Sequence, residues 1–190
     1  MSDAVNASLL FLINTLFDLY LFVLIIRLIL AYVGSNYYEP ITQFIVKITD
    51  PVVKPLRRFI PNYRHIEIST ILIIIALEMI KFGIISSLTF GFPNLLGLFL
   101  LAIGDACKLL IQTFFYAILL QAILSWIQPQ APVNSVLIQF NSPIMRPIQR
   151  IIPLVGGVDI TPIPALILLQ LVSIALINPL MAVALNIAIS

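Results

Sequence analysis

Four long hydrophobic stretches dominate the chain: Leu9–Val33, Ile66–Phe90, Leu95–Ile127 and Ile160–Ile189. Each has about 20 residues or more, enough for a helix to cross a hydrocarbon core about 30 Å thick. Backbone groups inside a bilayer need hydrogen-bond partners within their own segment, so all four stretches are predicted to be helices. The expected fold is an all-α, polytopic integral membrane protein.

Two of these stretches are longer than one crossing requires. In the third, Asp105 and Lys108 lie about one membrane thickness before the stretch ends, so we expect the crossing at about 108–127. Residues 95–104 would then be an extension or an outer-interface segment. In the fourth, Asn178-Pro179 predicts a kink or break, because proline removes a backbone donor.

Composition narrows the functional classes. The 190 residues are 61% hydrophobic and 9% charged, which is outside the range of soluble globular proteins. Cys107 is the one cysteine and His65 the one histidine, so no disulfide framework, zinc cage or redox pair can be assembled from them. No Ser-His-Asp or Cys-His set is expected either. We therefore expect no enzyme activity, no cofactor and no metal site.

The placement of lysine and arginine predicts the orientation. The N-terminus, the turn at 91–94 and the C-terminus carry neither residue, whereas both long loops do. The loop cations are Lys47, Lys54, Arg57, Arg58 and Arg64 in the first loop, and Arg146 and Arg150 in the second. By the positive-inside rule, both loops are expected in the cytoplasm and both termini in the periplasm.

An internal repeat is visible in the loops. Asp50-Pro51-x-x-Lys54-Pro55-x-x-Arg58-x-x-Pro61 recurs as Ser142-Pro143-x-x-Arg146-Pro147-x-x-Arg150-x-x-Pro153, at a constant offset of 92 residues. Each copy enters from outside, passes through its loop and returns, so the repeats are parallel. The expected units are 1–92, with helices at about 9–33 and 66–90 around loop 34–65, and 93–190, with helices at about 95–127 and 160–189 around loop 128–159.

Each loop begins with an amphipathic pattern. Ile41, Phe44, Ile45 and Ile48 share one helical face in the first copy, and Val133, Val136, Leu137 and Phe140 occupy the equivalent positions. A short helix of this kind suits the membrane interface.

A second short helix is expected to start at each proline motif. Asp50-Pro51 and Ser142-Pro143 fit an N-cap followed by proline at the first helical position, and Pro61 and Pro153 would end the helix. The basic loops comprise Lys54, Pro55, Arg57, Arg58, Pro61, Arg146, Pro147, Arg150 and Pro153. Their cations either rest on anionic headgroups, at about 1 kcal/mol each, or form a dedicated lipid or partner site.

The doubled proline–arginine motif, the four spans and the two-copy layout resemble the YggT family over nearly the whole chain. The resemblance implies a small integral protein of the bacterial inner membrane without a settled biochemical activity. It also implies an association with osmotic stress or potassium handling in some bacteria. Relatives of one-repeat length are linked to cell division, to nucleoid or thylakoid organisation and to haem attachment on a plastid cytochrome. The family supplies no catalytic residues to carry over.

Ionisable residues inside the spans mark function or interhelical pairing. They are Asp18, Arg27, Glu78, Lys81, Asp105 and Lys108. At 1.5 Å per residue, Asp18 and Lys81 lie about 22 and about 20 Å from the inner boundary, so they are expected to pair. Arg27 is expected to reach Glu78, to turn toward the other repeat or to snorkel to the headgroups. Asp105 and Lys108 are expected to form a local, exposed pair.

The repeat gives four of these charges uncharged polar counterparts. Asp18, Arg27, Glu78 and Lys81 map onto Gln112, Gln121, Gln170 and Ser173. Eight related polar positions predict a bundle interior held by hydrogen bonds. Whether this network joins helices or forms a polar, proton-sensitive pathway stays open, because the second requires that the charges reach water.

The expected function is that of a non-catalytic scaffold or accessory protein in the inner membrane. Its partners would be anionic headgroups and another membrane protein, with no nucleic acid. One alternative is a permeation component for ions or small solutes, linked to osmotic stress or potassium. A second alternative is an assembly factor for a membrane cytochrome.

Overall fold

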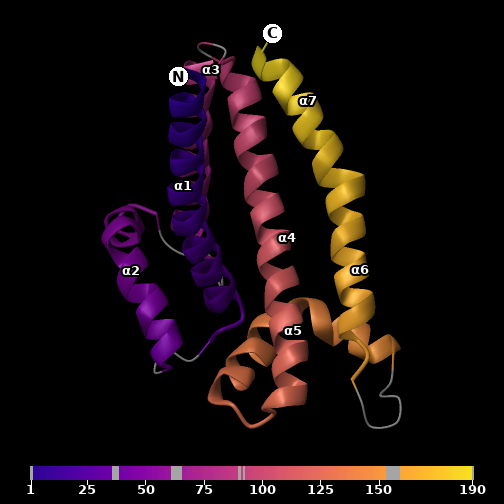
Figure 1. The fold of residues 1–190 in the computed structure, drawn as a ribbon. Helices are drawn as coiled ribbons and strands as arrows, with labels where there is room; N and C mark the ends of the chain where they lie inside the picture. Colours follow the sequence, from indigo (N-terminus) through magenta and orange to yellow (C-terminus); the bar gives the residue numbers. More distant parts are fainter. Residues whose placement is uncertain are drawn as a thin grey trace.

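The computed structural model describes residues 2–35, 39–60, 66–89, 91, 93–152 and 159–189, with side chains from Val5 onward. Its elements are all helices, as predicted (Figure 1). They are α1 (Ser2–Tyr32), α2 (Pro40–Arg57), α3 (Ile68–Thr89), α4 (Leu95–Ile127), α5 (Pro132–Ile151), α6 (Pro162–Val172), the π-helical turn η1 (Ser173–Ile177) and α7 (Asn178–Ile189).

Four helical stretches are long and apolar enough to cross a membrane: Val5–Tyr32, Ile68–Thr89, Leu95–Ile127 and Pro162–Ile189. They coincide with the four predicted stretches. The third is a single helix, α4, so residues 95–104 are a helical extension of the predicted crossing at 108–127. The side chain of Asn94 caps its start by accepting a hydrogen bond from the Leu96 amide at 3.0 Å.

The helices are arranged around α4, which contacts α1, α3, α5, α6, η1 and α7. Figure 1 shows both termini at one end of the bundle and α5 at the other. Helix α2 packs on α1 and α3, and α5 packs on α4 and α6. Each amphipathic helix therefore lies against the two helices that flank it in the chain.

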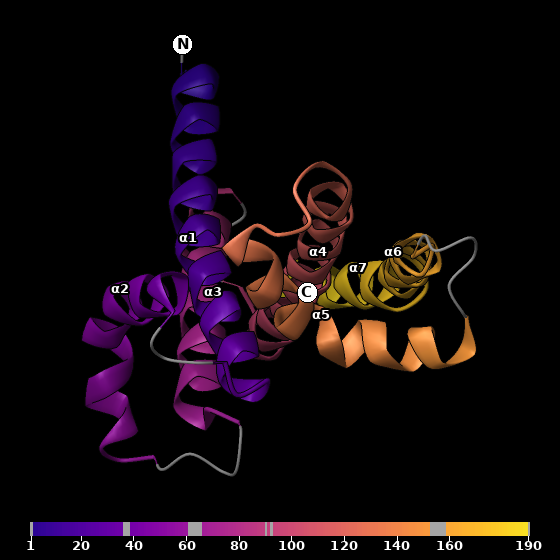
Figure 2. The same cartoon turned by 90° about the horizontal axis from the view of Figure 1, so that it is seen from below.

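The proline motifs lie inside helices and do not start new ones. Helix α2 continues through Pro51 and Pro55, and α5 continues through Pro143 and Pro147, so the predicted second short helix is wrong in both copies. The buried face of α2 runs unbroken from Thr49 across Pro51 to Val53, and this packing keeps the segment helical. Figure 2 shows that α2 bends instead of ending, as a helix does around an internal proline.

The apolar face predicted for α2 divides between two environments. Ile45 is buried inside the protein, whereas Ile41, Phe44 and Ile48 are exposed on its surface. In α5, Val136 and Phe140 are buried and Val133 is exposed. Pro61 and Pro153, the predicted ends of these segments, lie outside the described residues, as do Arg64 and His65.

The break predicted at Asn178-Pro179 takes the form of one wide turn. The amide of Asn178 donates to the carbonyl of Ser173, five residues back, and the helix then continues through Pro179. Proline has no amide to bond the preceding turn, and a π-helical turn at this point absorbs the irregularity.

Helix α4 approaches α7 closely at two glycines. A Cβ atom at position 97 would lie 2.3 Å from the backbone nitrogen of Ala188, and one at position 104 would lie 2.6 Å from Sδ of Met181. Small residues commonly allow such close approach between membrane helices. Gly97 therefore sets the distance between α4 and α7 near Ala188.

Candidate functional site

Arg27 of α1 lies at a buried junction between α1, α2 and the start of α3. Its Nε donates to Glu67 at 2.9 Å, and its Nη1 donates to Asp50 at 2.9 Å and to Thr49 at 2.7 Å. The residue is only 4% exposed. We call Arg27, Thr49, Asp50 and Glu67 the junction cluster.

The sequence left three arrangements open for Arg27, and the first of them, a contact with Glu78, is wrong. Asp50 reaches Arg27 because α2 folds back onto α1, and Glu67 reaches it from the residue just before α3. Arg27 also does not snorkel to the surface, since its guanidinium is satisfied inside the protein. Asp50, read from sequence as a helix cap, is instead a ligand of this buried cation.

Hydrogen bonds satisfy the remaining groups of the junction cluster. Glu67 also accepts from Thr70 Oγ1 at 2.8 Å and lies 3.7 Å from Arg57. Asp50 also binds Lys54 at 2.8 Å. Buried charges are tolerated when they are paired and hydrogen-bonded in this way. The cluster thus fastens α2 to α1 and α3.

Two opposing effects act on the Asp50 carboxyl. Partial burial alone would raise its pKa, but hydrogen bonds and charges from Lys54 and Arg27 outweigh burial and lower the pKa below its usual value. Asp50 therefore remains ionised at neutral pH and holds both cations.

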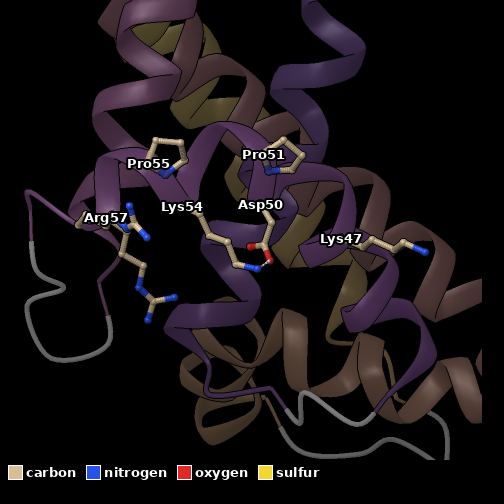
Figure 3. A pocket seen from close by; sticks show the side chains of 7 residues that line it. Lys47, Asp50, Pro51, Lys54, Pro55 and Arg57 are labelled. Carbon is tan, nitrogen blue, oxygen red and sulfur yellow. Dashed lines mark ion pairs between the residues drawn. The ribbon is translucent and has the colours of Figure 1, made fainter.

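A basic groove lies on α2 beside this cluster. It has a volume of about 680 Å³ and is lined by Lys47, Asp50, Pro51, Lys54, Pro55, Arg57 and Arg58. Figure 3 shows Lys54 reaching back to Asp50, while Lys47 extends away from that pair. Since Asp50 is the one carboxylate among the lining residues and already binds two cations, the groove carries excess positive charge. Its chemistry suits an anion.

The second half of the chain uses a neutral contact at the related junction. Asn141 of α5 donates to Gln121 of α4 at 2.8 Å. The repeat maps Gln121 onto Arg27 and Asn141 onto Thr49, so one amide pair takes the place of the guanidinium contact. Asp159, the counterpart of Glu67, accepts from the amide of Thr161 at 2.9 Å and so binds the start of its own helix.

A second charged cluster lies between α1, α3 and α4. Nζ of Lys81 lies 2.9 Å from Asp18, 2.7 Å from Glu78 and 2.5 Å from Asp105. The predicted pairing of Asp18 with Lys81 is confirmed. We call these four residues the intramembrane quartet.

The prediction of a local, exposed pair between Asp105 and Lys108 is wrong. Asp105 lies ten residues into α4, about 15 Å along its axis, and this places it beside Lys81 of α3. Within the described chain, Asp105 makes its ion pair with Lys81 of the neighbouring helix.

The eight predicted polar positions do not form one network. Gln112 is partly buried, Gln170 is exposed and Ser173 falls in η1. Among the contacts described, none of these three joins the quartet. Arg146, Pro147 and Arg150 are exposed on α5, as Pro55 is on α2. The residues missed from sequence were Thr49, Glu67 and Asn141, and their one signal was a polar residue at the equivalent position of the other repeat.

Comparisons with known proteins place the chain in a family. The CCB3/YggT family model matches it over residues 6–88 and 100–180. An uncharacterised protein of Vibrio alginolyticus is 40% identical over 170 residues, covering 86% of this chain and 90% of the relative. The uncharacterised protein YggT of Escherichia coli K12 is 34% identical over 176 residues, covering 92% of each. No solved structure matches the chain.

The matches to these relatives cover most of the chain, and the family model matches each half separately. An uncharacterised protein of Pseudomonas aeruginosa gives a similar picture, with 31% identity over 181 residues. None of these names states an activity. The chain belongs to the CCB3/YggT family.

Proposed function

We propose that the chain is a non-catalytic scaffold or accessory protein of the bacterial inner membrane that holds anionic lipid headgroups in the basic groove of α2. The groove carries the proposal, since Lys47, Arg57 and Arg58 surround a volume of about 680 Å³. Each such cation contributes about 1 kcal/mol at an anionic membrane surface. The groove is also held rigidly, because the junction cluster fastens α2 to the bundle.

The exposed apolar residues of α2 support an interfacial position for this helix. The side chains of Ile41, Phe44 and Ile48 are exposed on the surface of the protein, and the groove cations lie on the same helix. An amphipathic helix at a membrane surface buries its apolar face at the acyl boundary and keeps its basic face among the headgroups. The proposed repeat gives α5 the same position with fewer cations.

The proposed orientation has both loops in the cytoplasm and both termini in the periplasm. The positive-inside rule and the two termini at one end of the bundle (Figure 1) support it. A C-terminal alkaline-phosphatase fusion should be active, and a fluorescent reporter that folds only in the cytoplasm should stay dark. The opposite pattern would invert the proposed orientation and move the groove to the periplasmic face.

The intramembrane quartet bears on the choice between a scaffold and a permeation component. Permeation requires charges that reach water along a path, whereas a scaffold requires charges that pair with one another. Glu78 is 0% exposed and Lys81 is 1% exposed, and both lie in mutual ion pairs. This dry pairing favours the scaffold.

Lipid retention tests the proposal. The purified chain is exchanged into mixed micelles of phosphatidylglycerol and phosphatidylcholine, and native mass spectrometry counts the lipids that remain bound. Lys47→Gln with Arg58→Gln removes two groove cations that make no ion pair in the described structure. Arg146→Gln with Arg150→Gln removes the same charge from α5.

The α2 double variant should retain several-fold less phosphatidylglycerol than the α5 double variant. Equal retention in the two variants would show that charge alone, and not the groove, binds the lipid. For the scaffold role, cross-linking in cells should capture a membrane protein that the α2 variant captures less well. Unchanged capture would separate the partner surface from the groove.

A further inference from the structure

The intramembrane quartet has more negative than positive charge. Lys81 is its one ammonium, and Asp18, Glu78 and Asp105 each contribute a carboxylate. If all four groups were ionised, the quartet would carry a net charge of −2 within the apolar spans. Unbalanced charge in such surroundings is costly, and a buried carboxyl commonly avoids the cost by neutralisation.

The neighbouring elements do little to balance this charge. On α4, Lys108 lies one turn beyond Asp105 and is partly buried, without an ion pair to the quartet among the described contacts. Cys107 on α4 and Tyr20 on α1 are the other titratable groups nearby in sequence. Helix α7, which packs on α4, contains no ionisable side chain.

Glu78 differs from the other two carboxylates in its contacts. Lys81 donates hydrogen bonds to Asp18 and to Asp105. It lies 2.7 Å from Oε2 of Glu78, but the geometry there is not that of a hydrogen bond. Oε1 of Glu78 has no hydrogen-bond partner, although the side chain is 0% exposed.

Glu78 is also the most deeply buried of the three carboxylates. Asp18 is 45% exposed along its side chain and Asp105 is 15% exposed, so both have access to surroundings that Glu78 lacks. Neutralising Glu78 removes the most deeply buried anion and breaks no hydrogen bond. Neutralising either aspartate would weaken a hydrogen bond from Lys81.

We propose that Glu78 binds a proton, which makes the quartet a proton-binding site between α1, α3 and α4. The carboxylate takes up one proton at Oε1 and becomes a carboxylic acid, while Lys81 stays an ammonium shared by the two aspartates. The net charge of the quartet changes from −2 to −1. Nζ of Lys81 already occupies the centre where a bound metal ion would sit, and no described group of three His, Cys, Asp or Glu side chains is arranged to hold a metal ion.

Infrared spectroscopy detects this proton directly. The full chain in phosphatidylcholine nanodiscs at neutral pH should show the carbonyl stretch of a protonated carboxyl, and labelling glutamate with ¹³C should shift it. Glu78→Gln should abolish the band. Glu67→Gln is the matched control, since Glu67 is equally buried but paired with Arg27, and it should leave the band unchanged.

Two results would overturn the proposal: no protonated-carboxyl band at neutral pH, or a band that survives Glu78→Gln. Asp105→Asn adds a graded test. With one carboxylate fewer, Lys81 is shared less and stabilises the Glu78 anion better, so the band should weaken or disappear. If sodium or potassium chloride removes the band where choline chloride does not, an alkali cation and not a proton is the resident ligand, and the proposal fails.

Thermal unfolding, followed as the loss of helical circular dichroism, gives a second readout. Glutamate in an unfolded chain has a pKa of about 4.3. If Glu78 keeps its proton when folded, its contribution to stability is full below that pH and falls as pH rises above it, until the folded protein also releases the proton. Glu78→Gln should remove this loss. A loss of the same size in both proteins would exclude Glu78 as its source.

Discussion

The two halves of the molecule join their helices through different kinds of contact. In the first half, α1 is joined to α2 and α3 by the ion pairs of Arg27 and Lys81. In the second half, α4 is joined to α5 by the neutral pair Gln121–Asn141, and to α7 by close contact at Gly97. The related positions therefore do not require charge in order to form this fold.

The comparison bears on how each half responds to the loss of one side chain. An ion pair buried in an apolar medium contributes little net stability over a neutral replacement, yet it costs much when one partner is removed. A neutral hydrogen bond can be lost at about 1 kcal/mol. The first half should therefore be far more sensitive to single substitutions than the second.

The largest effect is expected for Lys81→Met, because three carboxylates lose their shared cation. Removal of one partner from a buried pair costs about 3–5 kcal/mol. Adding Asp18→Asn should restore only part of this loss, since Glu78 and Asp105 remain. A thermal-stability cycle in detergent measures both. Full rescue by Asp18→Asn would show that Lys81 serves Asp18 alone.

Arg27→Gln places in α1 the residue type that α4 has at the equivalent position, Gln121. It is expected to cost about 3 kcal/mol of stability, because Asp50 and Glu67 lose their buried cation. Gln121→Ala, which breaks the counterpart contact, should cost about 1 kcal/mol. The same unfolding assay compares them. Equal losses would remove the proposed difference between the halves. Adding Glu67→Gln to Arg27→Gln should recover part of the stability.

Gly97→Leu tests the packing of the second half, with an expected cost of about 1–3 kcal/mol from overpacking. The new side chain would meet the backbone at Ala188, so α7 must move away from α4. Cysteine cross-linking between the outer ends of these helices measures the displacement. Gly83→Leu is the control, because a Cβ there meets nothing within 4 Å.

The smallest expected effect is the loss of the stability contributed by Asp50 at low pH. The pKa of Asp50 is lowered in the folded protein, so its contribution to stability is present above the unfolded value of about 3.9 and is lost as pH falls below it. Acidification through this range should therefore loosen α2, measured as a loss of hydrogen-exchange protection at the Val53 amide. Asp50→Asn should lack this protection at every pH. An acid effect that persists in this variant would assign the titration to another carboxyl.

Hydrophobic length predicted the four spans, and a depth count paired Asp18 with Lys81. The same count failed for Arg27, because it treated Asp50 as part of a loop outside the bundle. That residue is brought inward by the packing of α2, which depends on contacts distant in sequence. The prediction that a new helix starts at Pro51 failed for a related reason. Proline destabilises a helix locally, but burial of Thr49 and Val53 on one face outweighs this cost.

The wide turn η1 changes the rotational phase of the last helix. Ala165 and Ala188 both pack toward α4, although 23 residues of regular helix would leave them about 140° apart. One extra residue held in η1 takes back roughly 100° of that rotation, which leaves about 40°. Deleting one residue from η1 should therefore keep both alanines facing α4, whereas deleting one from α7 ahead of Ala188 should rotate Ala188 by about 100°. The last helix can therefore lose one residue at η1 and still place the same face against α4.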